Sequence, residues 1–69
     1  METILKSSSN DSFDLTLKLT INCNLTSMDV CVVLFNKAND KKQVRHFDPN
    51  KLCDALDFYW QQEYMFIKT

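Results

Sequence analysis

Three cysteines and one histidine are the residues of this chain with the greatest chemical reactivity. Cys23, Cys31, His46 and Cys53 supply the ligand types of a Cys₃His zinc site. Structural zinc sites usually draw two thiolates from one tight turn, whereas here the residues are widely separated in the sequence. The spacing therefore predicts no metal site and no cofactor. We expect free thiols in a reducing compartment, with Cys31 packed as a small hydrophobic residue.

Catalysis also has weak support in the sequence. A nucleophilic cysteine would need His46 as its base and a third group to orient the histidine, and no such group is evident. Cys31 and Cys53 both lie in apolar stretches, where a thiol is inert. The chain contains no glycine, which excludes the backbone loops that cradle phosphates and the nucleophile elbow of hydrolases. We expect a protein that is not an enzyme and has no small-molecule substrate.

Basic residues form a second group of interest. They surround a predicted hairpin and the start of a predicted helix: Lys37, Lys41, Lys42, Arg45 and Lys51. Such a group is suited to contacts with phosphates. However, the net charge of the chain is −1, whereas nucleic-acid-binding domains usually carry a strong basic excess. A nucleic-acid-binding regulator that uses these residues is therefore the alternative hypothesis.

Aromatic residues near the C-terminus form a third group. On a helical wheel, Tyr59 and Trp60 fall largely in the apolar arc, whereas Phe58 falls on the polar flank beside Asp54. An aromatic side chain on a polar helix flank is typical of a protein interface, where such residues dominate the binding energy. The candidate partner-binding residues are Phe58, Trp60, Tyr64 and Phe35.

Strands are predicted in the first two thirds of the chain. Residues 30–35 are apolar on both faces and predict a buried central strand. Residues 13–22 alternate between apolar and polar types, which predicts one buried face and one solvated face. A turn at Asn39 and Asp40 leads to a more polar strand over residues 42–47, expected at the sheet edge. Residues 1–12 are a flexible lead-in or contain a short strand through Ile4 and Leu5.

A helix is predicted after the strands. Asp48 and Pro49 form a helix start, and the helix is expected to run over residues 49–63. One arc of this helix is apolar, and we expect it to pack on the sheet: Leu52, Cys53, Ala55, Leu56, Tyr59 and Trp60. Residues 64–68 fit a continued helix and a further strand equally well.

These elements predict one small α+β domain over residues 13–69. It would contain an antiparallel sheet of three strands, or four if the N-terminus adds one, packed on one C-terminal helix in the order β-β-β-α. A single helix covers only one face of a sheet. Because exposed contiguous apolar patches are rare on monomers, we expect a second copy or a protein partner to cover the other face of residues 30–35.

The leading functional hypothesis is a small non-enzymatic protein-interaction module, such as an inhibitor, adaptor or antitoxin-like modulator, and a homodimer is expected. The richness in Lys and Asn suggests an AT-rich genome, and with the 69-residue length it suggests a phage or viral accessory protein. The sequence has no transmembrane-length apolar run and no signal-peptide core, so we expect a cytoplasmic protein, in the host cytoplasm if it is viral, with no membrane association.

Overall fold

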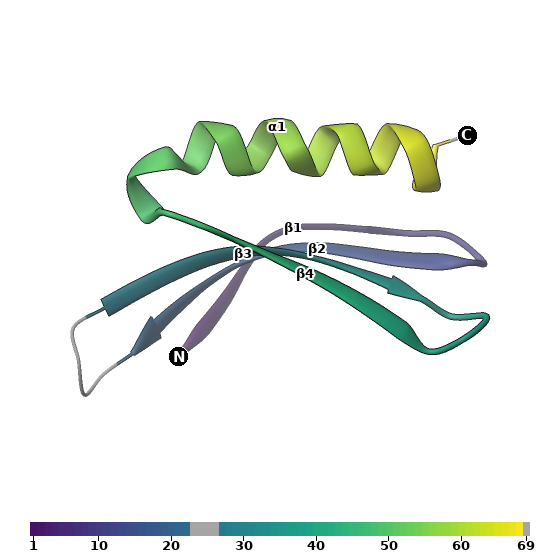
Figure 1. Cartoon of the computed structure of the whole chain (residues 1–69), viewed down its shortest axis with the longest axis horizontal. Coiled ribbons are helices and arrows are strands. Elements are labelled where there is room, and N and C mark those ends of the chain that lie inside the picture. Colours follow the sequence, from purple (N-terminus) through teal and green to yellow (C-terminus); the bar gives the residue numbers. More distant parts are fainter. Residues whose placement is uncertain (23–26, 69) are drawn as a thin grey trace.

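The protein is a four-stranded antiparallel sheet with one helical segment packed on one of its faces (Figure 1). The computed structural model describes residues 1–22 and 27–68, and the side chains of Asn22 and Ser27 lie outside this description. The strands lie side by side in chain order: β1 (Glu2–Ser9), β2 (Phe13–Asn22), β3 (Ser27–Asn36) and β4 (Lys41–Phe47). This arrangement confirms the predicted α+β class, and the N-terminus supplies the fourth strand.

Strand β1 includes residues that sequence analysis placed in a polar lead-in. Ser7, Ser8 and Ser9 pair with β2, and the register shifts between Ile4 and Lys6. An edge strand is held by backbone hydrogen bonds to its neighbour, so it needs few apolar side chains of its own. The composition of this segment therefore gave a poor indication of its secondary structure.

The core lies between the sheet and the helix. On β2, Leu15 and Leu17 are fully buried and lie opposite Leu34 and Val32 of β3. Full burial of each such side chain contributes about 1.5–3 kcal/mol. The predicted alternation of residues 13–22 and the central position of β3 are both confirmed.

Strand β4 forms one edge of the sheet, as predicted. The hairpin that leads to it contains Asp40, whose φ of 55° lies in the left-handed region. In a chain without glycine this conformation falls to residues such as Asp and Asn, which tolerate it best. The side chains of Asn36 and Asn39 support the turn by accepting hydrogen bonds from the backbone N–H groups of Ala38 and Lys41.

The helical segment begins where the sequence predicts. Asp48 Oδ1 accepts a hydrogen bond from the backbone N–H of Asn50 at 2.8 Å, and Pro49 occupies the first turn. The segment has three parts in succession: the 3₁₀ turn η1 (Pro49–Lys51), the α-helix α1 (Leu52–Gln62) and the π-helical turn η2 (Glu63–Ile67). Residues 64–67 therefore continue the helix and do not form a strand.

The rotation of the helix differs from the prediction. Ala55 and Tyr59 are buried as expected, but Trp60 is 49% exposed, and Leu52 and Cys53 are also exposed. Phe58, which was placed on the polar flank, packs against the core instead. The prediction that Trp60, Leu52 and Cys53 face the sheet is therefore wrong, and so is the placement of Phe58.

Two aromatic contacts account for this rotation. Phe58 lies with its ring centroid 5.7 Å from that of Phe47 at the end of β4, and Phe66 lies 5.1 Å from Phe13 at the start of β2. These contacts fix the helix at two points, at its middle over the β4 edge and near its C-terminal end over β2. With Phe58 and Phe66 turned towards the sheet, Trp60 is left about half exposed.

Hydrogen bonds tie β1 and the following turn to the helix. Ser8 Oγ donates to the Glu63 carboxylate and lies 2.6 Å from the buried Tyr59 hydroxyl, which then acts as the donor to Ser8. Asn10 Nδ2 donates to the carbonyl oxygen of Phe66 at 2.9 Å. The edge strand β1, in which Ile4 and Leu5 are the apolar residues, is thus anchored by polar contacts.

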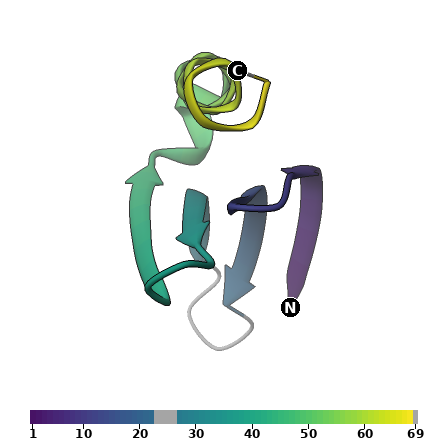
Figure 2. The ribbon, with the colours of Figure 1, turned by 90° about the vertical axis from the view of Figure 1, so that its right-hand side faces the viewer.

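The opposite face of the sheet has no covering element within residues 1–22 and 27–68. Figure 2 shows the helix on one side of the four strands only, and the smallest principal extent of the molecule is 15 Å. We call this second side the outer face. None of the helices described here has the length and apolar character needed to cross a membrane.

Candidate functional site

The exposed side of the helix carries a cluster of large apolar side chains. Trp60, Tyr64 and Met65, which we call the helix surface, are 49%, 76% and 56% exposed. Together with Asp57 and Gln61 they line a shallow depression of about 540 Å³. Trp60 and Tyr64 stand four residues apart, which places them one above the other on a helix.

Phe58 and Phe35, the other predicted partner-binding residues, do not join this cluster. Phe58 is partly buried between the helix and β4, with the Arg45 guanidinium 4.9 Å from its ring centroid. Phe35 alternates with the inward-facing Leu34 and lies opposite Lys42 of β4 on the outer face. Of the four predicted residues, the fold brings together only Trp60 and Tyr64.

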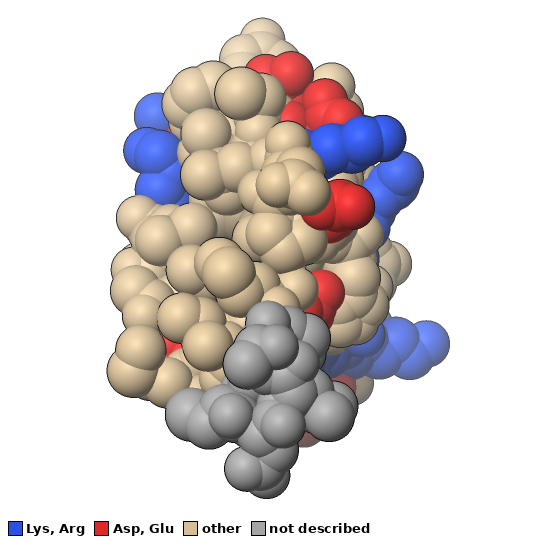
Figure 3. Space-filling view, turned by 90° about the vertical axis from the view of Figure 1, so that its left-hand side faces the viewer, with Lys and Arg blue, Asp and Glu red and all other residues tan. Residues whose placement is uncertain are grey.

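The basic residues are distributed over several surfaces. Lys37 Nζ lies 3.4 Å from the Asp14 carboxylate and donates to the Asn10 carbonyl oxygen. Arg45 is opposite Val32 on the helix side of the sheet, whereas Lys42 is on the outer face. In the view of Figure 3, basic side chains occupy two flanks, with acidic side chains among those of one flank.

The remaining basic residues lie near opposite ends of β4. Lys41 begins the strand, and Lys51 follows its end by four residues, in the first turn of the helical segment. A strand of this length spans roughly 20 Å at about 3.3 Å per residue. The five basic residues therefore do not form one continuous patch among the described side chains.

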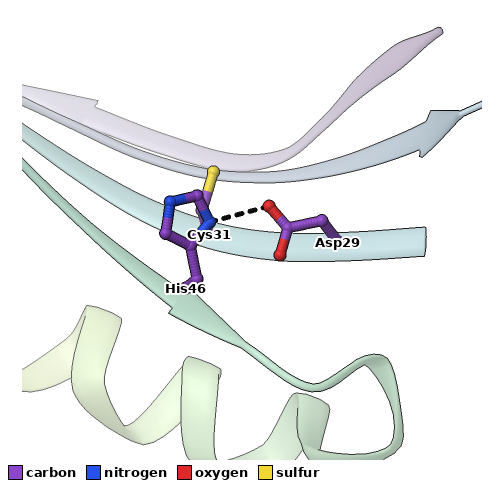
Figure 4. A group of neighbouring side chains, drawn as sticks. All are labelled: Asp29, Cys31 and His46. Atoms are coloured by element: carbon purple, nitrogen blue, oxygen red, sulfur yellow. Dashed lines mark hydrogen bonds and ion pairs between the residues drawn. The ribbon is translucent and has the colours of Figure 1, made fainter. Parts of the chain in front are cut away.

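The outer face holds a cluster of three potential metal ligands or catalytic groups. Cys31 of β3 is directly opposite His46 of β4, and Asp29 lies two residues before Cys31 on the same face. His46 Nδ1 is 2.7 Å from Asp29 Oδ2. One ligand atom from each residue lies within 4.8 Å of the others (Figure 4).

Cys31 and His46 are candidates from their residue types alone, whereas Asp29 was not predicted to belong with them. The missing information was the register of the β3–β4 hairpin, since only this register places His46 beside a particular pair of β3 residues. The fold does not bring Cys53 to this cluster, because Cys53 is exposed on the helix at the other side of the sheet. Cys23 lies outside the described residues.

The state of the Cys31 thiol argues against nucleophilic catalysis. Burial raises the pKa of this thiol, and the nearby Lys18 ammonium offsets the effect only in part. A protonated thiol is a poor nucleophile at neutral pH. In Figure 4 the dashed line joins His46 to Asp29, not to Cys31. The cluster therefore contains a Cys, His and Asp without an activated nucleophile.

A groove lies between β4 and the helix. Its volume is about 270 Å³, slightly below the range of roughly 300–1,000 Å³ typical of ligand pockets. Its lining is formed by Val32, Leu34, Gln43, Val44, Arg45, Phe58 and Gln62. Arg45 is the single charged residue among these, so the groove lacks the paired acid and base groups that catalysis needs.

Trp60 and Tyr64 form an exposed aromatic surface, and Asp29, Cys31 and His46 form a compact polar cluster on the opposite side of the molecule. Comparison with protein-family models, with curated proteins and with solved structures finds no match to this chain.

Proposed function

We propose that this protein is a small non-enzymatic interaction module that binds a protein partner through its helix surface. Its mode of action would be that of an inhibitor, adaptor or antitoxin-like modulator in the cytoplasm. The observation that carries the proposal is the exposure of Trp60, Tyr64 and Met65 on one side of the helix. Trp and Tyr are the residues most often responsible for binding energy at interfaces.

The helix surface is exposed because other aromatic residues of the helical segment fill the core. Phe58 and Phe66 occupy the positions against the sheet, and Trp60 is displaced to the solvent side. An exposed Trp does not contribute much to the stability of its own domain, but it offers a large apolar area to a partner. This supports a binding role for Trp60.

The charges around the helix surface indicate the kind of partner. Asp54 and Asp57 are both exposed, and Asp57 borders the depression beside Trp60. The Lys6 ammonium of β1 also lies 5.8 Å from the Trp60 ring centroid. A partner that accepts this surface would therefore have an apolar groove with a basic residue facing Asp57, in the manner of proteins that bind one face of an amphipathic helix. Complementary charges would mainly set the rate and specificity of association.

A second copy of the chain is the competing occupant, and it would use the other apolar surface. On the outer face, Ile4 of β1 is 64% exposed and Val44 of β4 is 43% exposed. Val33 and Phe35 lie on β3, which is between these two edge strands. A homodimer formed through this face would leave Trp60 accessible. The two occupants therefore respond to different substitutions.

The test compares three proteins in capture and ultracentrifugation experiments. Wild type, a Trp60→Ala/Tyr64→Ala variant and a Val44→Ala control are used as baits, and a captured protein is then purified and titrated against each. We expect the double variant to lose at least about 2 kcal/mol of binding free energy and Val44→Ala to bind like wild type.

Equal binding by all three baits would contradict the proposal. Self-association that Val44→Ala weakens and the double variant does not would assign the interface to a second copy.

A further inference from the structure

We infer that Asp29, Cys31 and His46 form a zinc-binding site on the outer face of the sheet. This inference does not depend on the proposed function, because the cluster lies on the side of the sheet opposite to the helix surface. It also differs from the widely spaced Cys₃His set considered from the sequence, which the fold does not assemble.

The strands place the three ligands by their register. Residues Asp29 and Cys31 alternate along β3 and so point to the same face, and His46 is the cross-strand neighbour of Cys31. A β-hairpin is a rigid support in which directly paired residues have Cβ atoms about 4.5–5.5 Å apart. The cluster is thus built from two adjacent regular strands and not from a loop.

The distances allow a zinc ion after small side-chain rotations. Zinc binds sulfur at about 2.3 Å and nitrogen or oxygen at about 2.0–2.2 Å, so its ligand atoms lie roughly 3–4 Å apart. The ligand atoms here lie within 4.8 Å of one another, and the His46 to Asp29 distance is already 2.7 Å. The His46 and Asp29 side chains are 66% and 47% exposed, so both have room to turn towards the thiol.

The donor set matches the preference of zinc. Thiolate sulfur, imidazole nitrogen and carboxylate oxygen are the three ligand types that zinc takes from proteins. Three protein ligands leave a fourth tetrahedral position for water. The buried Cys31 would serve as the fixed ligand, whereas the two exposed ligands close over the ion from above.

The charges near the cluster are compatible with a bound dication. Zinc with one thiolate, one carboxylate and a neutral imidazole has no net charge, and the thiol proton is released to solvent on binding. Lys18 is opposite Cys31 on β2, and its ammonium is paired with the Glu2 carboxylate at 3.2 Å. Lys42 is the other cation that influences the thiol, and it points to the same face four residues before His46.

The experiment uses the full chain, reduced and freed of metal, with Zn²⁺ and Co²⁺ as probes. Zinc affinity is measured by competition with a chromophoric chelator, and Co²⁺ reports its ligands by absorption, because a thiolate ligand gives a sulfur-to-cobalt charge-transfer band. The variants are Cys31→Ala, His46→Gln and Asp29→Asn. Cys53→Ser is the matched control for a thiol outside the site. Circular dichroism without metal verifies that each variant is folded.

We expect one zinc per chain and a cobalt charge-transfer band in wild type and in Cys53→Ser. Loss of an outer-sphere partner already lowers metal affinity by about 10- to 100-fold, so loss of a ligand should lower it by at least about tenfold. His46→Gln and Asp29→Asn replace exposed side chains, and they keep the test valid if Cys31→Ala fails to fold. Absence of stoichiometric zinc binding, or binding that His46→Gln leaves unchanged, would overturn the inference and leave the cluster as an ordinary surface ion pair.

Discussion

The Phe58 and Trp60 side chains, two residues apart, have opposite roles in the structure. Phe58 fills the space between the helix and Phe47, whereas Trp60 is about half exposed and has the Lys6 ammonium of β1 5.8 Å from its ring centroid. We expect Phe58→Ala to lower the free energy of unfolding by about 2–3 kcal/mol, since it removes a partly buried aromatic ring. Trp60→Ala should cost less than about 1 kcal/mol. Urea denaturation followed by circular dichroism measures both, and a larger loss for Trp60→Ala would contradict the observed helix rotation.

Ala55 is a small helix residue buried against the sheet. Its side chain has no exposed area, and it lies in the same core cluster as Val30 and Val32. A larger residue has no space there, so Ala55→Leu should destabilise the protein by about 1–3 kcal/mol through overpacking. Thermal unfolding checks this value. Unchanged stability would mean that the helix can move away from the sheet without loss.

Glu63 makes the stability of the protein depend on pH. The hydrogen bond from Ser8 lowers the pKa of this carboxyl group below its ordinary value of 4.5, and Lys68 adds to the effect. A carboxyl group with a lowered pKa in the folded state stabilises the fold above the ordinary value, and this contribution is lost as the pH falls through the lowered pKa.

We therefore expect the urea midpoint of wild type to fall between about pH 5 and pH 3. Glu63→Gln, which cannot titrate, should show a smaller decrease over the same interval. Glu2→Gln is a control, because Glu2 forms an exposed ion pair on the other side of β1. Equal pH dependence of wild type and Glu63→Gln would show that Ser8 does not stabilise the charged carboxylate.

The start of the helical segment is the element boundary that the sequence predicts best. Asp48 and Pro49 make the cap and the first turn by local chemistry alone. Asp48→Ala should lower the free energy of unfolding by about 1 kcal/mol, whereas Asp48→Asn, which keeps an acceptor oxygen, should cost less. Chemical denaturation of the two variants makes the comparison. Equal losses would show that the charge of Asp48, and not its hydrogen bond, matters.

The features that the sequence predicts depend on residues close together in the chain, whereas the features that it does not predict depend on residues far apart in the chain. Strict alternation identifies β2, and the Asp48–Pro49 pair identifies the helix start, because both signals lie within a few residues. The helix rotation depends on Phe13 and Phe47, which are distant in sequence from their partners on the helix. A helical wheel contains no information about these strand residues, so it could not choose between Phe58 and Trp60.

The candidate sites were predictable to a similar degree. Trp60 and Tyr64 were named from composition and spacing, and the fold brings them together. The Asp29, Cys31 and His46 cluster requires the register of β3 and β4, which depends on the length of the turn between them. An error of two residues in that turn would have paired Cys31 with a different residue of β4.

At the scale of the whole molecule, the single tryptophan reports on the helix surface. Trp60 is 49% exposed, so a small quencher should reach it in the folded protein. We expect acrylamide to quench the native emission, though less efficiently than in urea, at protein concentrations where only the monomer is present. Protection from the quencher in the isolated monomer would contradict the exposure of this side chain. Protection that appears only on adding a partner would support the proposed function.

The order of the elements along the chain has a consequence for biosynthesis. All four strands precede the helix, so a growing chain can form the entire meander while Leu15, Leu17 and Val32 still lack their cover. An apolar sheet with two unprotected edges is prone to associate with other chains. We expect a chain that stops after Phe47 to collect in inclusion bodies, and chaperones to engage this protein chiefly before residues 49–67 emerge.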